Sequence, residues 1–64
     1  MNKELAVELL EQLKTGQLSE IVVKKEDFLA FREQLIQRPD FKHFQGIAKH
    51  GGVTIYKYLQ EERS

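Results

Sequence analysis

The sequence has 64 residues and no cysteine, so one small hydrophobic core must hold the fold together without disulfide bonds. Secreted domains of this size usually depend on disulfides, and we therefore expect a cytoplasmic protein. The absence of cysteine also removes thiol nucleophiles and thiolate metal ligands. Because a core this small gives limited stability, we expect self-association, most simply as a homodimer.

The composition is that of a globular protein that acts through local surfaces. Hydrophobic residues make up 41% and charged residues 31% of the chain, and ten basic side chains balance ten acidic ones. With no net charge, no overall field draws the chain to nucleic acid or to an anionic membrane. No apolar run approaches the roughly 18 residues of a membrane span, and residues 1–4 do not resemble a signal peptide. We predict one domain over residues 1–64, with a frayed tail at 61–64 and no membrane partner.

Two segments show the spacing of amphipathic helices. Residues 2–15 begin with Asn2, which can cap the first turn, and are followed by Gly16, which can take the left-handed conformation that ends a helix. Residues 26–37 form the second helix, which Pro39 ends. The apolar positions are Ala6, Leu9, Leu10 and Leu13 in the first helix, and Phe28, Leu29, Phe31, Leu35 and Ile36 in the second.

Three shorter segments have the composition of strands, at 20–24, 41–49 and 53–59. The pair Gly51-Gly52 predicts a two-residue hairpin turn between the last two, which would set Ala48 opposite Ile55 and Phe44 opposite Leu59. In this register the core face carries Phe44, Ala48, Val53, Ile55 and Leu59, and the other face carries Gln45, Ile47, Lys49, Thr54, Tyr56 and Tyr58.

The fold class predicted from these elements is α+β, in two layers and in the order α-β-α-β-β. Both helices pack on one face of a small, three-stranded, mainly antiparallel sheet that ends in the Gly-Gly hairpin. The pattern leaves open whether the first strand lies beside the second or the third.

Residues 41–49 also fit helical spacing. In that case the element order is loosely similar to a winged helix, and the resemblance implies a third helix at 40–49 that reads the major groove, with Lys42, His43 and Lys49 as its basic residues. We favour a strand, because Gly46 lies in the middle of the segment and a hairpin partner follows.

The chain is poor in the side chains that catalysis and metal binding require. The only serines are Ser19 and Ser64, and neither has the context of a nucleophile. His43 and His50 have Asp40 as the one nearby carboxylate, which is too few ligands for zinc or iron. We therefore predict no enzyme activity, no catalytic residue, no metal, no cofactor and no small-molecule substrate.

The run Ile21-Val22-Val23 suggests that both faces of the sheet are covered, although two helices can cover only one. An apolar and aromatic patch on the other face is then available to a second protein surface. We expect this patch to consist of Val22, Ile47, Tyr56 and Tyr58. The main functional hypothesis is accordingly a protein-association module.

The hairpin region supports an alternative, a small nucleic-acid-binding protein. Residues 38–58 hold the basic side chains Arg38, Lys42, Lys49 and Lys57 against Asp40 alone. Lysines beside tyrosine rings are typical of surfaces that follow phosphates and stack bases of single-stranded nucleic acid. These four cations are the expected contacts to an anion or nucleic acid.

Arg32 lies within the apolar arc of the second helix. One interpretation is that its stem packs across the stripe while its guanidinium pairs with Glu8, Glu11 or Glu20. The other is that Arg32 anchors an anionic ligand or a partner at a crevice between helix and sheet.

Overall fold

The computed structural model describes residues 1–61, which fold in the predicted order α-β-α-β-β. Residues 62–64 of the predicted tail lie outside the described residues. Three short 3-10 turns join the elements, at Lys25–Asp27, Phe41–His43 and His50–Gly52. The elements are α1 (Lys3–Thr15), β1 (Ile21–Val23), α2 (Phe28–Ile36), β2 (Phe44–Ala48) and β3 (Thr54–Tyr58).

Local chemistry sets the ends of α1. The side chain of Asn2 accepts a hydrogen bond of 2.7 Å from the Leu5 backbone N–H, as expected of an N-cap. At the other end Gly16 takes the left-handed conformation with φ of 88°, and its N–H donates to the Leu13 carbonyl. Both predicted ends of the first helix are therefore confirmed. The second helix is shorter than predicted, because a 3-10 turn precedes Phe28.

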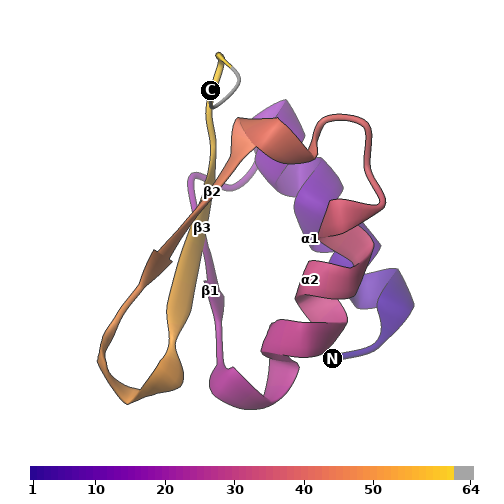
Figure 1. Ribbon diagram of the computed structural model, residues 1–64. Helices are drawn as coiled ribbons and strands as arrows, with labels where there is room; N and C mark the ends of the chain where they lie inside the picture. The colour runs from indigo at the N-terminus through magenta and orange to yellow at the C-terminus, as the bar shows by residue number, and fades with distance from the viewer. Residues whose placement is uncertain (62–64) are drawn as a thin grey trace.

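The sheet is antiparallel throughout, with strand order β1-β3-β2, so the first strand lies beside the third. Figure 1 shows α1 and α2 together on one side of this sheet, which confirms the predicted two-layer α+β architecture. Residues 44–48 form the strand that we favoured. The third helix that a winged helix would require is not present at 40–49, where only the turn Phe41–His43 has helical character.

The hairpin register differs from the prediction by one residue. The Lys49 N–H donates to the Val53 carbonyl at 2.7 Å, so that pair closes a three-residue loop instead of a two-residue turn. Gly51 and Gly52 both have positive φ, 79° and 76°, which a residue with a side chain would adopt only with strain. As a result, Phe44 pairs with Tyr58 and Ala48 with Thr54.

A shift of one residue moves every side chain of a strand to the other face. The expectation that Tyr56 and Tyr58 lie away from the helices was therefore wrong. Tyr56 is 5% exposed, and its ring centre lies 4.8 Å from that of Phe31. Tyr58 packs edge-on against Phe44. Conversely, Ile55 was expected in the core and lies on the outer face, where it pairs with Val22 and Ile47.

The core fills the space between the helices and the sheet. Phe31, Phe44, Leu10 and Val23 are its largest fully buried side chains. Ala48, which we had placed in the core, is exposed, because the helices leave that end of β2 uncovered. The buried residues are Ala6, Leu10, Leu13, Ile21, Val23, Phe31, Leu35, Phe44 and Tyr56.

The register can be tested by stability. We expect Tyr56→Ala to lower the free energy of unfolding by about 3 kcal/mol, because it removes a buried ring. Ile55→Ala should cost about 1 kcal/mol, because that side chain is only partly buried. Urea denaturation of both variants gives the comparison, with Lys57→Ala as an exposed control from the same strand. A larger loss for Ile55→Ala than for Tyr56→Ala would restore the register predicted from sequence.

Candidate functional site

The outer face of the sheet carries one apolar row. The register places Val22 beside Ile55, and Ile55 beside Ile47, so the row crosses all three strands. Val22 is 56% exposed, and no described element packs over this face (Figure 1). Two of the four predicted patch residues, Val22 and Ile47, are thus brought together there. Ile55 was missed, because the predicted register assigned it to the core.

The outer row is narrow. Its neighbouring pair along the strands is Gln45 beside Lys57, and both of these side chains are exposed. Ile47 and Ile55 are themselves half-buried. The row is therefore a strip of three aliphatic side chains with polar side chains along one border, smaller than the apolar and aromatic patch expected from the sequence.

A cleft of about 330 Å³ opens on the other side of the sheet, between α2 and β2. It exists because β2 presents Gly46 towards the helices. A Cβ at that position would lie 3.0 Å from Cε1 of Tyr56, so the glycine also allows the Tyr56 ring to approach the strand closely. The lining residues are Arg32, Leu35, Ile36, Phe41, Phe44, Gly46 and Tyr56.

A second hollow, of about 230 Å³, is lined by Phe28 of α2 together with Ala48 and Thr54 of the hairpin. Phe28 begins α2 and Ala48 ends β2, whereas Arg32 and Gly46 lie midway along their elements. Helix α2 therefore runs antiparallel to β2, with hollows between them at two levels of the strand.

Arg32 stands at the margin of the cleft. Its side chain is exposed and forms no ion pair with any of residues 1–61, so the expected pairing with Glu8, Glu11 or Glu20 was wrong. The reason is that the buried side of α2 centres on Phe31 and Leu35. Burial raises the pKa of the Tyr56 hydroxyl, and the positive charge of Arg32 opposes that shift.

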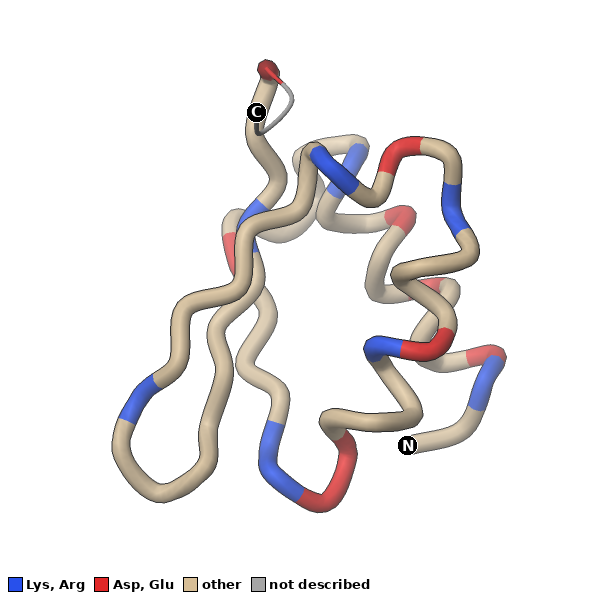
Figure 2. Tube along the Cα trace, viewed as in Figure 1, with Lys and Arg blue, Asp and Glu red and all other residues tan. Residues whose placement is uncertain are grey.

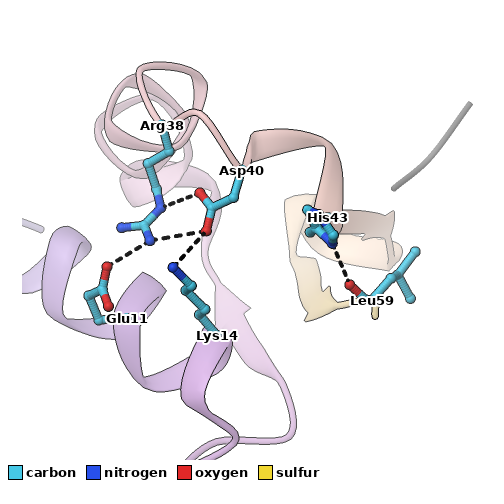
Figure 3. Close-up of polar contacts among 6 residues, drawn as sticks. All are labelled: Glu11, Lys14, Arg38, Asp40, His43 and Leu59. Atoms are coloured by element: carbon cyan, nitrogen blue, oxygen red, sulfur yellow. Dashed lines mark hydrogen bonds and ion pairs between the residues drawn. The ribbon is translucent and has the colours of Figure 1, made fainter. Parts of the chain in front are cut away.

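The arginine that does pair is Arg38, in the turn after α2 (Figure 3). Its Nε lies 2.9 Å from Oδ1 of Asp40, and its Nη2 lies 2.7 Å from Oε1 of Glu11 on α1. Lys14 completes the group, with Nζ 3.8 Å from Oδ2 of Asp40. The guanidinium carbon also lies 5.7 Å from the centre of the Phe44 ring. This network joins α1 to the turn that leads into β2.

The network shifts the ionisation of its members. Hydrogen bonding to Asp40 raises the pKa of the Arg38 guanidinium, and the same contact lowers the pKa of the Asp40 carboxyl. Arg38 is thus held by two carboxylates and contributes little free positive charge to a surface.

The four predicted basic contacts do not form one track. Arg38 is in the network, Lys42 is in the turn Phe41–His43, Lys49 borders the hollow beside Ala48, and Lys57 lies on the outer face. Figure 2 shows Lys and Arg positions distributed over the whole trace and interspersed with acidic ones. Tyr58 stacks on His43, with ring centres 5.2 Å apart, and Tyr56 is buried.

His43 is held by the fold, because its Nδ1 lies 2.8 Å from the Leu59 carbonyl oxygen (Figure 3). Within residues 1–61, no three His, Asp or Glu side chains gather closely enough to bind a metal ion. In the same part of the chain, no helix has the length and apolar character needed to cross a membrane.

The Asp40 contact predicts a dependence of stability on pH. The folded-state pKa of Asp40 lies below its ordinary value of 3.8. The contribution of Asp40 to the free energy of unfolding is therefore complete above about pH 5, and it is lost as the pH falls below the ordinary value and through the folded-state pKa. We expect Asp40→Asn to lower the free energy of unfolding by about 1 kcal/mol at pH 7 and by less at pH 3. Urea denaturation at both pH values measures this.

Glu20→Gln is the matched control, because Glu20 is exposed and pairs with no other residue among 1–61. Equal losses for Asp40→Asn at pH 7 and at pH 3, or the same small change in both variants, would contradict the assigned role of Asp40.

The chain matches a known protein family. The family described as YkzS-like protein matches residues 3–57, a span that includes both helices and all but the last residue of the sheet. No curated protein and no solved structure matches the chain.

Proposed function

The chain belongs to the YkzS-like protein family, and we propose that it functions by protein association, as a homodimer in the cytoplasm with no catalytic role. The absence of cysteine supports the reducing compartment. The non-catalytic role is supported by Ser19, which no side chain among residues 1–61 contacts by a hydrogen bond and which therefore lacks an activating base there.

The observation that carries the proposal is the apolar surface that α2 leaves uncovered beside the cleft. Leu29 is 74% exposed and Ile36 is 50% exposed. They are seven residues apart, so they lie on the same side of the helix. Ile36 and the exposed ring of Phe41 both line the cleft. Large aliphatic and aromatic side chains gathered around a hollow are typical of a surface that another protein covers.

A second copy of the chain is the partner favoured by size. A 64-residue chain without disulfides has a small core, and it gains stability from any apolar area that a dimer buries. We place the interface on α2 in preference to the outer row, because two of the three side chains of the outer row are already half-buried, whereas Leu29 is 74% exposed and Ile36 is 50% exposed.

The proposal gives no role to nucleic acid. Stacking needs open ring faces, whereas Tyr56 is buried and Tyr58 packs against both His43 and Phe44. The remaining hypothesis, that scattered lysines bind phosphates, stays a prediction that an oligonucleotide titration at low salt would test.

Sedimentation equilibrium of the purified protein tests the proposed dimer. We expect a monomer–dimer equilibrium, and we expect Leu29→Lys to weaken it about tenfold or more, because each interface would bury two charged side chains in place of two leucines. Val22→Lys is the matched control, since it places the same charge on the outer row.

Two results would contradict the proposal. A wild-type protein that stays monomeric at every concentration removes the homodimer. A dimer that Val22→Lys disrupts and Leu29→Lys does not would transfer the interface to the outer face of the sheet.

A further inference from the structure

We propose that two copies of the chain join along the open edge of β2 while their α2 helices pack antiparallel, both around one two-fold axis beside Gly46. This inference rests on the proposed function, because it names the geometry of the same dimer. The partner is a second copy, since the surface is complementary to itself in backbone hydrogen bonding, in apolar contact and in charge.

The first part of this surface is the backbone edge of β2, whose one neighbour in the described sheet is β3. The Lys49 N–H bonds to Val53 and the Leu59 N–H bonds to His43. Hydrogen-bonded pairs recur at every second residue of an antiparallel ladder. The odd-numbered residues of β2 therefore bond to β3, and Gly46 and Ala48 direct their backbone groups to the open edge.

Antiparallel pairing of two such edges with Gly46 opposite Gly46 of the second copy gives each free N–H of the edge, those of Gly46 and Ala48, an acceptor in the second copy. The two glycines exchange hydrogen bonds, and each Ala48 N–H meets the Phe44 carbonyl of the second copy. The Phe44 N–H donates within its own chain to Phe41. On the helix side the seam carries Phe44, Gly46 and Ala48, and the Phe44 ring is 1% exposed because it lies in its own core, so no large side chain projects across the seam. The product is one continuous sheet made of both copies.

The second part is a stripe on α2 formed by Leu29, Arg32, Glu33 and Ile36. At about 100° per residue these four positions fall within an arc of about 100°, and all four are exposed. In an antiparallel pair of helices centred between Arg32 and Glu33, each Leu29 meets Ile36 of the second copy. Each Arg32 then meets Glu33 of the second copy, which gives two reciprocal ion pairs.

Both charges of the stripe are available for this contact. Neither Arg32 nor Glu33 forms an ion pair with any of residues 1–61. The stripe also faces the correct direction, because Arg32 and Ile36 line the cleft that opens over β2.

The two parts share one axis. Arg32 and Gly46 line the same cleft, and Phe28 and Ala48 line the hollow at the next level. The midpoint of the stripe therefore lies at the level of Gly46 along the strand. A two-fold axis through that level relates the β2 edges and the α2 stripes together, and the second copy then closes the cleft.

Charge reversal tests the stripe. Relative to wild type, we expect Arg32→Glu and Glu33→Arg each to weaken dimerisation about tenfold or more, since each creates two like-charge contacts. The double variant Arg32→Glu/Glu33→Arg should regain most of the lost affinity, because the ion pairs form again with their signs exchanged. Glu8→Arg on α1 is the control and should leave the dimer unchanged. Sedimentation equilibrium gives the affinity of the wild type and of each of the four variants.

A backbone variant tests the edge. Ala48→Pro removes the N–H that points away from β3, a change that an edge strand tolerates, so the folded monomer should persist with its circular dichroism spectrum retained while the dimer is lost. Ala48→Ser should dimerise as wild type does. Amide exchange adds a test without substitution: the Gly46 and Ala48 N–H groups should become protected as concentration drives dimer formation.

The outcomes distinguish the dimer itself from the geometry of the dimer. A wild-type dimer in which charge reversal has no effect, or in which the Gly46 and Ala48 amides stay unprotected, overturns this geometry and leaves the proposed homodimer intact. A wild-type monomer at every concentration overturns both.

Discussion

The hydrogen bond that closes the hairpin, from the Lys49 N–H to the Val53 carbonyl, determines which side chains of β3 face the helices. It fixes the register of β2 against β3, and the register sends Tyr56 under α2 against Phe31. The Tyr56 ring then needs a residue without a side chain on the adjacent strand, and Gly46 provides it. Because glycine leaves space above β2, Gly46 both accommodates the Tyr56 ring in the core and opens the cleft.

The contrast between the two arginines near α2 follows from their positions around the helix and its end. Arg38 comes after the last turn, where it reaches Glu11 on α1 and Asp40 in its own turn. Arg32 lies within the helix, away from α1, and faces the cleft without an ion-pairing partner among residues 1–61. Arg38 therefore connects α1 to the turn after α2, and Arg32 is the cation that the proposed dimer uses.

Local signals in the sequence predicted much of the fold. The caps at Asn2 and Gly16, the helical spacing and a strand within residues 41–49 depend on neighbouring residues, and each was confirmed, with the strand limited to Phe44–Ala48. The register was not predictable in this way, because two glycines fit a two-residue turn as well as a three-residue loop. Tyrosine is compatible with either face of a strand, so the residue type of Tyr56 did not reveal that the predicted register was wrong. Because of this error, the predicted patch included Tyr56 and Tyr58, which lie on the helix side of the sheet.

The proposed dimer also accounts for the outer face. With Gly46 opposite Gly46 of the second copy, Ile47 of one copy lies beside Gln45 of the other. The two apolar rows, each made of Val22, Ile55 and Ile47, are then offset along the continuous sheet and meet polar side chains at the seam. An interrupted apolar surface of this kind favours further association less than a continuous belt would. Since a two-fold contact also uses up the β2 edge of both copies, assembly along that edge ends at the dimer.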